Sequence, residues 1–350
     1  MVKSVGRNPF FIQDSLAKQM IEKSFWHPLG KLGDLAGGPH AVVVLGEDLV
    51  VWQAPGGAYQ AWADRCPHRG TKLSLGHIAH GRLECAYHGW QFDAAGQCKV
   101  IPALPNFVPP QSQRACTYAT AQAYGLLWVR MENSENMAGG EQALPQFAAE
   151  ADVRLRKVNC GPYIVNASAP RIVENFLDLS HFAFVHEGWL GTREAMAVPH
   201  YDVTPTPTGV LATGCKAVQP RSSVHATGNA LVEYSYEVVS PYAAVLTKVP
   251  EAGTTVVADL RESIALFVCP VMPETSLVWI RMAMNDFESS DQKLIDFQNT
   301  IFGQDQPILE SQHPKRLPLQ AGAEQHCAAD RMSLAYRRFL MNTGITFGVC

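Results

Sequence analysis

The chain has 350 residues, of which 47% are hydrophobic, and its 28 basic and 32 acidic residues give a net charge of -4. This composition suits one large or two ordinary globular domains, and the near balance of charge argues against a nucleic-acid or anionic-membrane partner. No window is apolar for long enough to form a signal peptide or a membrane span, so a cytoplasmic protein with nine reduced cysteines is expected.

The first half of the chain is predicted to form a small β domain. After an N-terminal segment, residues 1–24, short apolar or alternating runs are separated by Gly, Pro and Asp. This pattern is typical of antiparallel strands and predicts an all-β domain over residues 25–130. The polar, Gly-containing residues 131–150 are typical of a connector.

The second half, residues 131–350, is predicted to form a mixed domain. Helical periodicity over residues 171–187 precedes strand-like runs over residues 201–285, and a last helical stretch begins near Ser290. The predicted fold class is therefore α+β, with an N-terminal all-β domain followed by an antiparallel sheet that helices cover.

Four potential metal ligands lie in two glycine-rich loops of the first domain. Cys66 and His68 form a Cys-x-His pair, and Cys85 and His88 form a Cys-x-x-His pair after a sixteen-residue gap. Zinc sites of the finger type usually group two Cys in one pair and two His in the other. One Cys and one His in each pair instead favour a two-iron centre whose irons take two thiolates and two imidazoles respectively. Trp90, directly after the second pair, is expected to pack over this centre and limit solvent access.

A second group of ligands is predicted in ENFLDLSHFAFVHEG. Asp178 and His181 are three residues apart, so on a helix the carboxylate could accept a hydrogen bond from the imidazole. His181 and His186 are five apart and would point about 140° away from each other on a regular helix. They can share one metal only if the helix ends or bulges between them, and Gly188 is consistent with an ending.

The third ligand of a 2-His-1-carboxylate site is predicted to be Asp305. It interrupts an apolar stripe in the last helical stretch, formed by Leu294, Phe297, Ile301, Asp305 and Ile308. Gly303 and Pro307 flank it and suggest a kink or a restart of the helix. Three other acids lie off the stripe and are expected to be solvated: Asp286, Asp291 and Asp296.

These motifs resemble those of the Rieske non-heme iron oxygenases. CPHRG and CAYHGWQFD match both halves of the cluster motif, and the resemblance extends from FWHPLG to the C-terminus. The iron-site pattern of that family is matched in order by Asn175, Asp178, His181 and His186, with a late acidic segment that GQDQPILESQ resembles.

The resemblance implies a [2Fe-2S] Rieske cluster, a mononuclear Fe(II) and O2 as co-substrate. It also implies a homotrimer, in which Asp178 bridges His181 and the cluster ligand His88 of a neighbouring subunit. No G-x-G-x-x-G loop follows a strand, so an NAD(P)H-dependent reductase, a ferredoxin or both must supply electrons.

Short matches within the family, including HFAFVHEGWLG and the terminal FGVC, resemble the hydroxylases of tricyclic guanidinium alkaloids of the saxitoxin type. They favour insertion of one oxygen into a C–H bond of a nitrogen-rich heterocycle. KLSLG and DQPILESQ resemble the methylxanthine N-demethylases instead, which keeps N- or O-demethylation as the alternative. Tyr234 and Tyr236 are expected to be ordinary sheet residues.

Two alternatives of other classes remain open from the sequence. One is a Rieske electron-transfer protein with no oxygenase activity, which would hold about two irons per chain rather than about three. The other is a zinc-bound structural module with a small-molecule sensor domain, which would be colourless.

Overall fold

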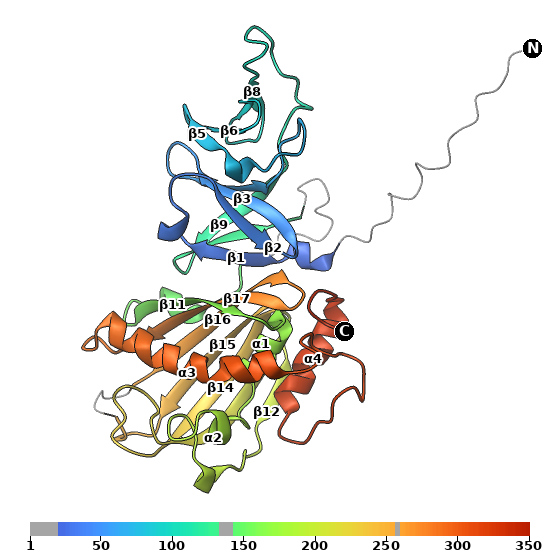
Figure 1. Cartoon of the computed structure of the whole chain (residues 1–350). Coiled ribbons are helices and arrows are strands. Elements are labelled where there is room, and N and C mark those ends of the chain that lie inside the picture. The colour runs from blue at the N-terminus through green and yellow to red at the C-terminus, as the bar shows by residue number, and fades with distance from the viewer. Residues whose placement is uncertain (1–19, 133–142, 256–259) are drawn as a thin grey trace, which may run out of the picture.

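The computed structural model describes residues 20–132, 143–255 and 260–350. Two β-rich parts are stacked end to end, with the N-terminal part above the C-terminal part in Figure 1. The predicted α+β class is confirmed, because an all-β part precedes an antiparallel sheet with helices. Most of the predicted N-terminal segment and part of the connector, at 1–19 and 133–142, lie outside the described residues.

The N-terminal domain contains a six-stranded antiparallel sheet in the order β1-β10-β9-β4-β3-β2. Its core is aromatic, since Trp52, Trp62 and Trp128 are fully buried. The strands are β1 (Trp26–Lys31), β2 (His40–Val44), β3 (Glu47–Gln53), β4 (Tyr59–Ala63), β9 (Thr117–Ala123) and β10 (Leu126–Arg130).

A smaller sheet carries the loops in which the Cys/His quartet lies. It has four short antiparallel strands in the order β5-β6-β7-β8. Figure 1 shows it at the end of the molecule that is remote from the C-terminal domain. The strands are β5 (His77–Ala79), β6 (Arg82–Glu84), β7 (Gln91–Phe92) and β8 (Cys98–Val100).

The C-terminal domain is built on one seven-stranded antiparallel sheet in the order β11-β17-β16-β15-β14-β13-β12. The strands are β11 (Arg156–Val165), β12 (Asp202–Pro205), β13 (Val210–Gln219), β14 (Ala230–Ser240), β15 (Ala243–Pro250), β16 (Glu262–Met272) and β17 (Thr275–Met284).

The two faces of this sheet have different partners. Successive side chains of a strand point to opposite faces, and in β16 Leu266 and Val268 join the core beneath the helices. Phe267 and Cys269 point the other way and pack in a core shared with residues of the first domain such as Trp128. Because both faces of β16 are buried over most of its length, its sequence is continuously apolar from Ile264 onwards instead of alternating.

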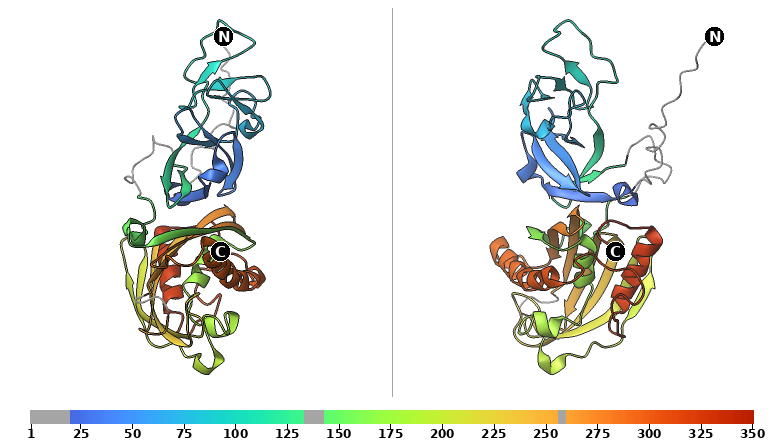
Figure 2. Two further views of the ribbon diagram at one scale, coloured as in Figure 1. Left: turned by 90° about the vertical axis from the view of Figure 1, so that its left-hand side faces the viewer. Right: turned by 45° about the vertical axis from the view of Figure 1, so that its right-hand side comes forward.

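The described part of the C-terminal domain also contains four α-helices: α1 (Ala169–Phe176), α2 (Phe182–Val185), α3 (Asp291–Ser311) and α4 (Arg331–Thr343). α3 packs on β11 and α1, whereas α4 packs on β12 and β13, and Figure 2 shows these two helices at separate edges of the domain. Within the residues that the structure describes, no helix is long and apolar enough to cross a bilayer.

The last long helix differs in two respects from the prediction. It runs unbroken from Asp291 to Ser311 with Pro307 inside it, so the predicted restart is wrong. A side chain at Gly303, four residues before Pro307, would meet no other atom within 4 Å. The buried stripe also differs from the predicted one, since Ile308 is 45% exposed while Leu309 is 1% exposed.

Asp286 was expected to be solvated, and this is wrong, because it is 1% exposed. Its carboxylate accepts a hydrogen bond from His225 at 2.6 Å and one from the Ser289 backbone N–H at 2.9 Å. Burial alone would raise its pKa, but these hydrogen bonds hold the pKa of Asp286 at about 2. The sequence pattern predicted where α3 begins. It did not predict the turn at Asp286, whose hydrogen bond with His225 connects the start of α3 to a distant loop.

His27 joins the two domains and should make the fold sensitive to acid. It is fully buried on β1, and its ring centroid lies 5.9 Å from that of Tyr242 in the C-terminal domain. Its Nε2–H donates to the Glu22 carbonyl at 2.8 Å, and its Nδ1 is buried with no hydrogen-bond partner among the described residues. Burial lowers the pKa of His27 to about 4 from the usual 6.5.

Because the unfolded chain then binds the proton more tightly than the folded chain, the stability associated with His27 is present above pH 6.5 and is lost as the pH falls towards 4. We expect the wild type to lose about 2 kcal/mol more of its unfolding free energy between pH 7.5 and 5.0 than His27→Gln does. Urea denaturation at both pH values measures this difference. His40→Gln, at a histidine that is not buried, is the control and should retain the full pH dependence of the wild type.

Candidate metal centres

Two loops of the N-terminal domain have the same local shape and each begins at a cysteine. Cys66 lies shortly after β4, and Cys85 directly follows β6. In each loop the backbone N–H four residues on donates to the cysteine carbonyl, from Gly70 to Cys66 at 2.9 Å and from Gly89 to Cys85 at 3.0 Å. Both glycines have positive φ, 76° and 67°, a conformation that costs glycine little.

The quartet separates into a buried sulfur pair and an exposed nitrogen pair. Cys66 and Cys85 are each 2% exposed, whereas His68 and His88 are exposed, with ring centroids 4.6 Å apart. Burial raises the pKa of the Cys66 thiol to about 11, so a metal is needed to keep it as thiolate. Inner thiolates and outer imidazoles fit a two-iron cluster in which each iron takes one pair.

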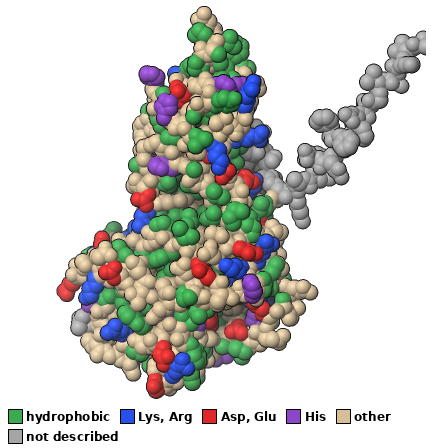
Figure 3. Space-filling model, viewed as in Figure 1, with side chains coloured by type: hydrophobic (Ala, Val, Ile, Leu, Met, Phe, Trp, Pro, Cys, Tyr) green, Lys and Arg blue, Asp and Glu red, His purple; other side chains and the backbone are tan. Residues whose placement is uncertain are grey.

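Trp90 contacts one of these imidazoles. Its ring stacks on His68 with centroids 4.4 Å apart and planes within 6° of parallel, and only 8% of it is exposed. The stack fixes the orientation of the His68 ring, and exclusion of water by Trp90 stays a prediction. Histidine side chains are visible on the surface near this end of the molecule in Figure 3.

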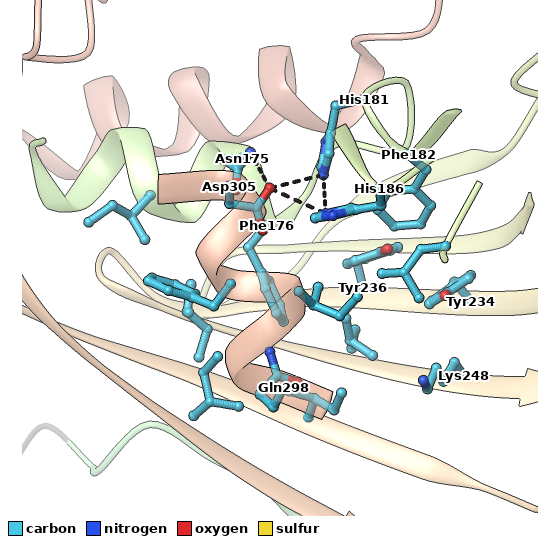
Figure 4. A pocket seen from close by; sticks show the side chains of 18 of the residues that line it. Asn175, Phe176, His181, Phe182, His186, Tyr234, Tyr236, Lys248, Gln298 and Asp305 are labelled. Atoms are coloured by element: carbon cyan, nitrogen blue, oxygen red, sulfur yellow. Dashed lines mark hydrogen bonds and ion pairs between the residues drawn. The ribbon is translucent and has the colours of Figure 1, made fainter. Parts of the chain in front are cut away.

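In the C-terminal domain, His181, His186 and Asp305 converge (Figure 4). The two Nε2 atoms lie 3.2 Å apart, and Oδ1 of Asp305 lies 3.5 Å from that of His181 and 3.3 Å from that of His186. Ligands about 2.1 Å from one metal and at right angles are about 3 Å from each other. The three atoms therefore fit the facial triad that holds a non-heme iron and leaves positions open on it.

The local chain path explains how two histidines five residues apart can face one another. α1 ends at Phe176, and α2 has only four residues, with His181 at its N-cap and His186 at its C-cap. The predicted continuous helix is thus broken before His181, and Asp178 lies in the intervening turn instead of on a helix surface. Gly188, with φ at 77°, lies in the turn that closes behind His186.

Three side chains hold the triad from outside. Nδ1–H of His181 donates to Asp178 at 3.1 Å, and Nδ1–H of His186 donates to Oε1 of Gln304 at 2.8 Å. Both hydrogen bonds leave Nε2 available as the metal ligand. Asn175 donates to Oδ1 of Asp305 at 3.4 Å. Although burial opposes ionisation, hydrogen bonds from His181 and Ser180 lower the pKa of Asp178.

Gln304 is the one partner of the triad that the sequence did not indicate, since an amide next to Asp305 carries no signal of its own. Replacing it with leucine removes the acceptor that fixes the His186 ring, so we expect iron at this site to bind about 10- to 100-fold more weakly. Competition with a chelator measures the change. Gln292→Leu, which removes an exposed amide of the same helix that bonds Asp296, is the control; equal affinities in the two variants would contradict the role of Gln304.

The triad lies at one end of a pocket in the C-terminal domain (Figure 4). Most of the lining is apolar, and it comes from α1, α3 and the helix-facing side of β14, β15, β16 and β17. The apolar and aromatic lining residues are Ile172, Phe176, Phe182, Leu190, Leu246, Ile264, Leu266, Ile280, Phe297, Ile301 and Phe302. The polar ones are Asn175, His181, His186, Tyr234, Tyr236, Lys248, Gln298 and Asp305.

The two tyrosines of β14 are more than ordinary sheet residues. Tyr234 and Tyr236 are two apart on one strand and therefore share a face, where their rings stack with centroids 5.6 Å apart. Both line the pocket. Their aromatic character was consistent with a strand, but only the tertiary structure shows that this face is the pocket wall.

Comparison with known families accounts for both centres. Residues 25–119 match the Rieske [2Fe-2S] domain, and residues 165–343 match the C-terminal domain of vanillate O-demethylase oxygenase. The chain is a Rieske non-heme iron oxygenase. The two matched regions contain the buried thiols and the facial triad respectively, so the family predicted from the motifs is confirmed.

Relatives of this oxygenase include demethylases of N-methylated purines. It is 34% identical over 327 residues to the methylxanthine N1-demethylase NdmA of Pseudomonas putida, covering 91% of this chain and 88% of that protein. It is 39% identical over 234 residues to a probable methylxanthine N7-demethylase, NdmC, of a Pseudomonas strain, covering 66% and 79% of the two chains. The structure of Pseudomonas putida NdmA with caffeine superposes with a TM-score of 0.78 at 31% identity, covering 92% and 90% of the chains.

Membership of this family settles the class of the protein. It is an O2-dependent enzyme with a Rieske [2Fe-2S] cluster and an oxygenase domain whose triad can hold a mononuclear iron. Oxygenases of this family take electrons from reductase or ferredoxin partners. The electron-transfer protein and the zinc module are therefore excluded. Hydroxylation of a guanidinium alkaloid, the main prediction from short C-terminal matches, gains no support from these relatives, whereas its demethylase alternative does.

Proposed function

We propose that this oxygenase removes a methyl group from a ring nitrogen of a heterocycle. The observation that carries the proposal is the facial triad at one end of a mostly apolar pocket, in a chain similar to methylxanthine demethylases over nearly its whole length. O2, two electrons and two protons convert N–CH3 into N–CH2OH and water. The carbon–nitrogen bond then breaks, and the products are N–H and formaldehyde.

His181, His186 and Asp305 would hold the Fe(II), which supplies the activation of O2 for insertion into a C–H bond. Asn175 fixes one oxygen of Asp305, and Gln304 orients His186. These contacts keep three ligand atoms on one side of the site, so the opposite side faces the pocket and the substrate.

The pocket wall would orient the substrate ring. Phe176 lies edge-on to Tyr236, with ring centroids 6.2 Å apart, and Phe302 lies on the opposing helix and also lines the pocket. Apolar walls of this kind hold a flat ring by burial and stacking without fixing its rotation. The amide of Gln298, which Figure 4 shows away from the triad, can accept or donate a hydrogen bond and so fix which methyl group approaches the iron.

Electrons would reach the triad from the cluster of another subunit. The quartet of one chain lies at the far end of its own N-terminal domain, away from the sheet and helices that hold the triad (Figure 1). The segments next to the strands β5, β6 and β8 expose large apolar side chains at Leu75, Tyr87, Leu104, Phe107 and Val108. Such a patch is typical of a protein interface.

The homotrimer that the family resemblance implies would cover this patch. Asp178 would then connect the His88 imidazole of one subunit to His181 of the next. The hydrogen bond between Asp178 and His181 is already present within the chain. A separate NAD(P)H-dependent reductase, a ferredoxin or both would reduce the cluster.

O-demethylation is the second candidate, because the C-terminal residues 165–343 match the vanillate O-demethylase family. The chemistry is the same, with a carbon–oxygen bond breaking in place of a carbon–nitrogen bond. The presence of a hydrogen-bonding amide, an ammonium group and two phenols in the pocket favours a nitrogen heterocycle with several polar atoms over a simple aryl ether.

Mass spectrometry of turnover mixtures tests the proposal. Iron-loaded protein, a surrogate reductase and NADH are incubated with caffeine, theobromine and vanillate in parallel, and formaldehyde is measured alongside. Loss of a methyl group from a methylxanthine, with an equal amount of formaldehyde, is the expected result. Demethylation of vanillate alone would establish the second candidate, and addition of oxygen without formaldehyde would make the protein a hydroxylase. A mixture without reductase controls for uncoupled oxidation.

A further inference from the structure

Lys248 is the one lysine or arginine among the described residues that line the pocket. It is only 5% exposed. Figure 4 shows it at the end of the pocket remote from the triad, with its nitrogen directed towards the other lining side chains. A buried lysine at the end of an apolar pocket is costly unless it is paired, so its partners determine what it can bind.

The Lys248 ammonium group has one hydrogen-bond acceptor and one ion-pair partner among the described residues. Nζ donates to the Ser222 carbonyl at 2.6 Å and lies 2.5 Å from Oε2 of Glu262. Glu262 is directly opposite Lys248 in the register of β15 and β16, so both side chains leave the sheet on the same face. Since an ammonium group carries three hydrogens, one is left to donate to a molecule in the pocket.

A second donor lies next to the lysine. Tyr234 faces Lys248 across β14 and β15, and its hydroxyl oxygen accepts a hydrogen bond from the Gln219 amide at 2.6 Å. Burial, with a smaller contribution from Glu262, raises the pKa of Tyr234, so the phenol stays protonated and keeps its own hydrogen to donate. This end of the pocket therefore presents hydrogen-bond donors, and a ligand that binds there must supply the acceptors.

We propose that Lys248 anchors a carbonyl oxygen or ring nitrogen of a neutral heterocycle, and that Glu262 makes the same position unfavourable for a carboxylate. The proposal deepens the proposed demethylation and rests on it for what happens at the triad. Lys248 would hold the polar edge of the ring while the methyl group to be oxidised points to the iron. It acts as a specificity-determining residue, since it does not touch the reacting carbon.

The preference for a neutral ligand follows from the pairing. Lys248 and Glu262 together have no net charge, so a ligand dipole can interact with the lysine without bringing a charge into the site. A carboxylate at the same place would approach the Glu262 carboxylate, and the low polarisability of a buried site strengthens that repulsion. Removing the charge of Glu262 should therefore reverse the selectivity.

Binding measurements on the iron-loaded protein without reductant test this inference apart from turnover. Isothermal titration with caffeine, theobromine, N-methylindole and vanillate compares neutral carbonyl ligands with a carbonyl-free ring and a carboxylate. We expect the wild type to bind the better of the two methylxanthines at least about tenfold more tightly than N-methylindole or vanillate. The double variant Lys248→Met/Glu262→Gln, which leaves no unpaired charge, should lose this preference. Glu262→Gln alone should bind vanillate at least about tenfold better than the wild type does.

Lys216→Met is the control, because Lys216 is an exposed lysine of β13 in the same sheet, and it should bind like the wild type. The inference is overturned if the double variant keeps the carbonyl preference, if Glu262→Gln gains no affinity for vanillate, or if the wild type binds vanillate best or none of the four. Tight carbonyl-dependent binding without demethylation would instead remove the proposed function and leave the role of Lys248 in place.

Discussion

Replacing Asp305 with alanine is expected to lower the iron content from about three atoms per chain to about two and to leave the visible spectrum of the cluster unchanged. Its Oδ1 is the oxygen ligand atom of the triad and lies within 3.5 Å of the Nε2 atoms of both histidines. Losing the metal removes several kcal/mol of stabilisation of the reacting state, so turnover should fall at least about a thousandfold. Iron analysis, absorption spectroscopy and formaldehyde release measure the three effects.

The matched control is Asp296→Ala. Asp296 is an exposed acid of the same helix whose side chain bonds only Gln292 among the described residues, so its loss should affect neither iron nor turnover. An Asp305→Ala protein that keeps its third iron, or keeps turnover without it, would show that the carboxylate of the site lies elsewhere.

The second large effect is expected for Asp178→Asn. The amide keeps the shape of the side chain but loses the charge that accepts hydrogen bonds from His181 and from the Ser180 backbone, at 3.1 and 2.8 Å. If Asp178 carries the contact between the two centres, steady-state turnover should fall about a hundredfold while the iron content stays at the wild-type level. Stopped-flow absorption can follow reoxidation of a prereduced cluster by O2 in the presence of substrate, and this step should slow by a similar factor.

Asp202→Asn, at an exposed carboxylate at the start of β12, serves as the comparison. Rapid cluster reoxidation in Asp178→Asn, with turnover lost only because iron is lost, would assign Asp178 to holding His181 and not to electron transfer.

The cluster loops could be predicted from the sequence because their information is local. A cysteine, a glycine with positive φ four residues later and a histidine in between form one turn, and the turn occurs twice. The two histidines of the triad were also predictable, since sharing a metal required the helix to end between them, and α2 does end at Val185. The additional break before His181 was not predicted. Asp305 followed from a polar residue on an apolar stripe.

The rest of the site depends on contacts between segments distant in the chain. Gln304 bonds a histidine 118 residues before it, and Asp286 is buried by a loop 61 residues away. Lys248 reaches the pocket only because β14, β15 and β16 align it with Tyr234 and Glu262. The pattern of one segment cannot show partners that lie in other segments. Asp286 was therefore expected to be solvated, although the fold buries it.

The cluster loops and the triad lie far apart in one chain (Figure 1), so if the proposed homotrimer forms, damage to one centre would leave the other usable by a neighbouring subunit. A chain lacking the cluster, as in His88→Ala, and a chain lacking the iron, as in Asp305→Ala, should each be inactive alone. Co-assembled in one oligomer, they should complement each other wherever the intact cluster of one chain meets the intact triad of the next. The functional unit would then be the junction between two chains. Each chain would take part in two such junctions and would supply its cluster to one and its triad to the other.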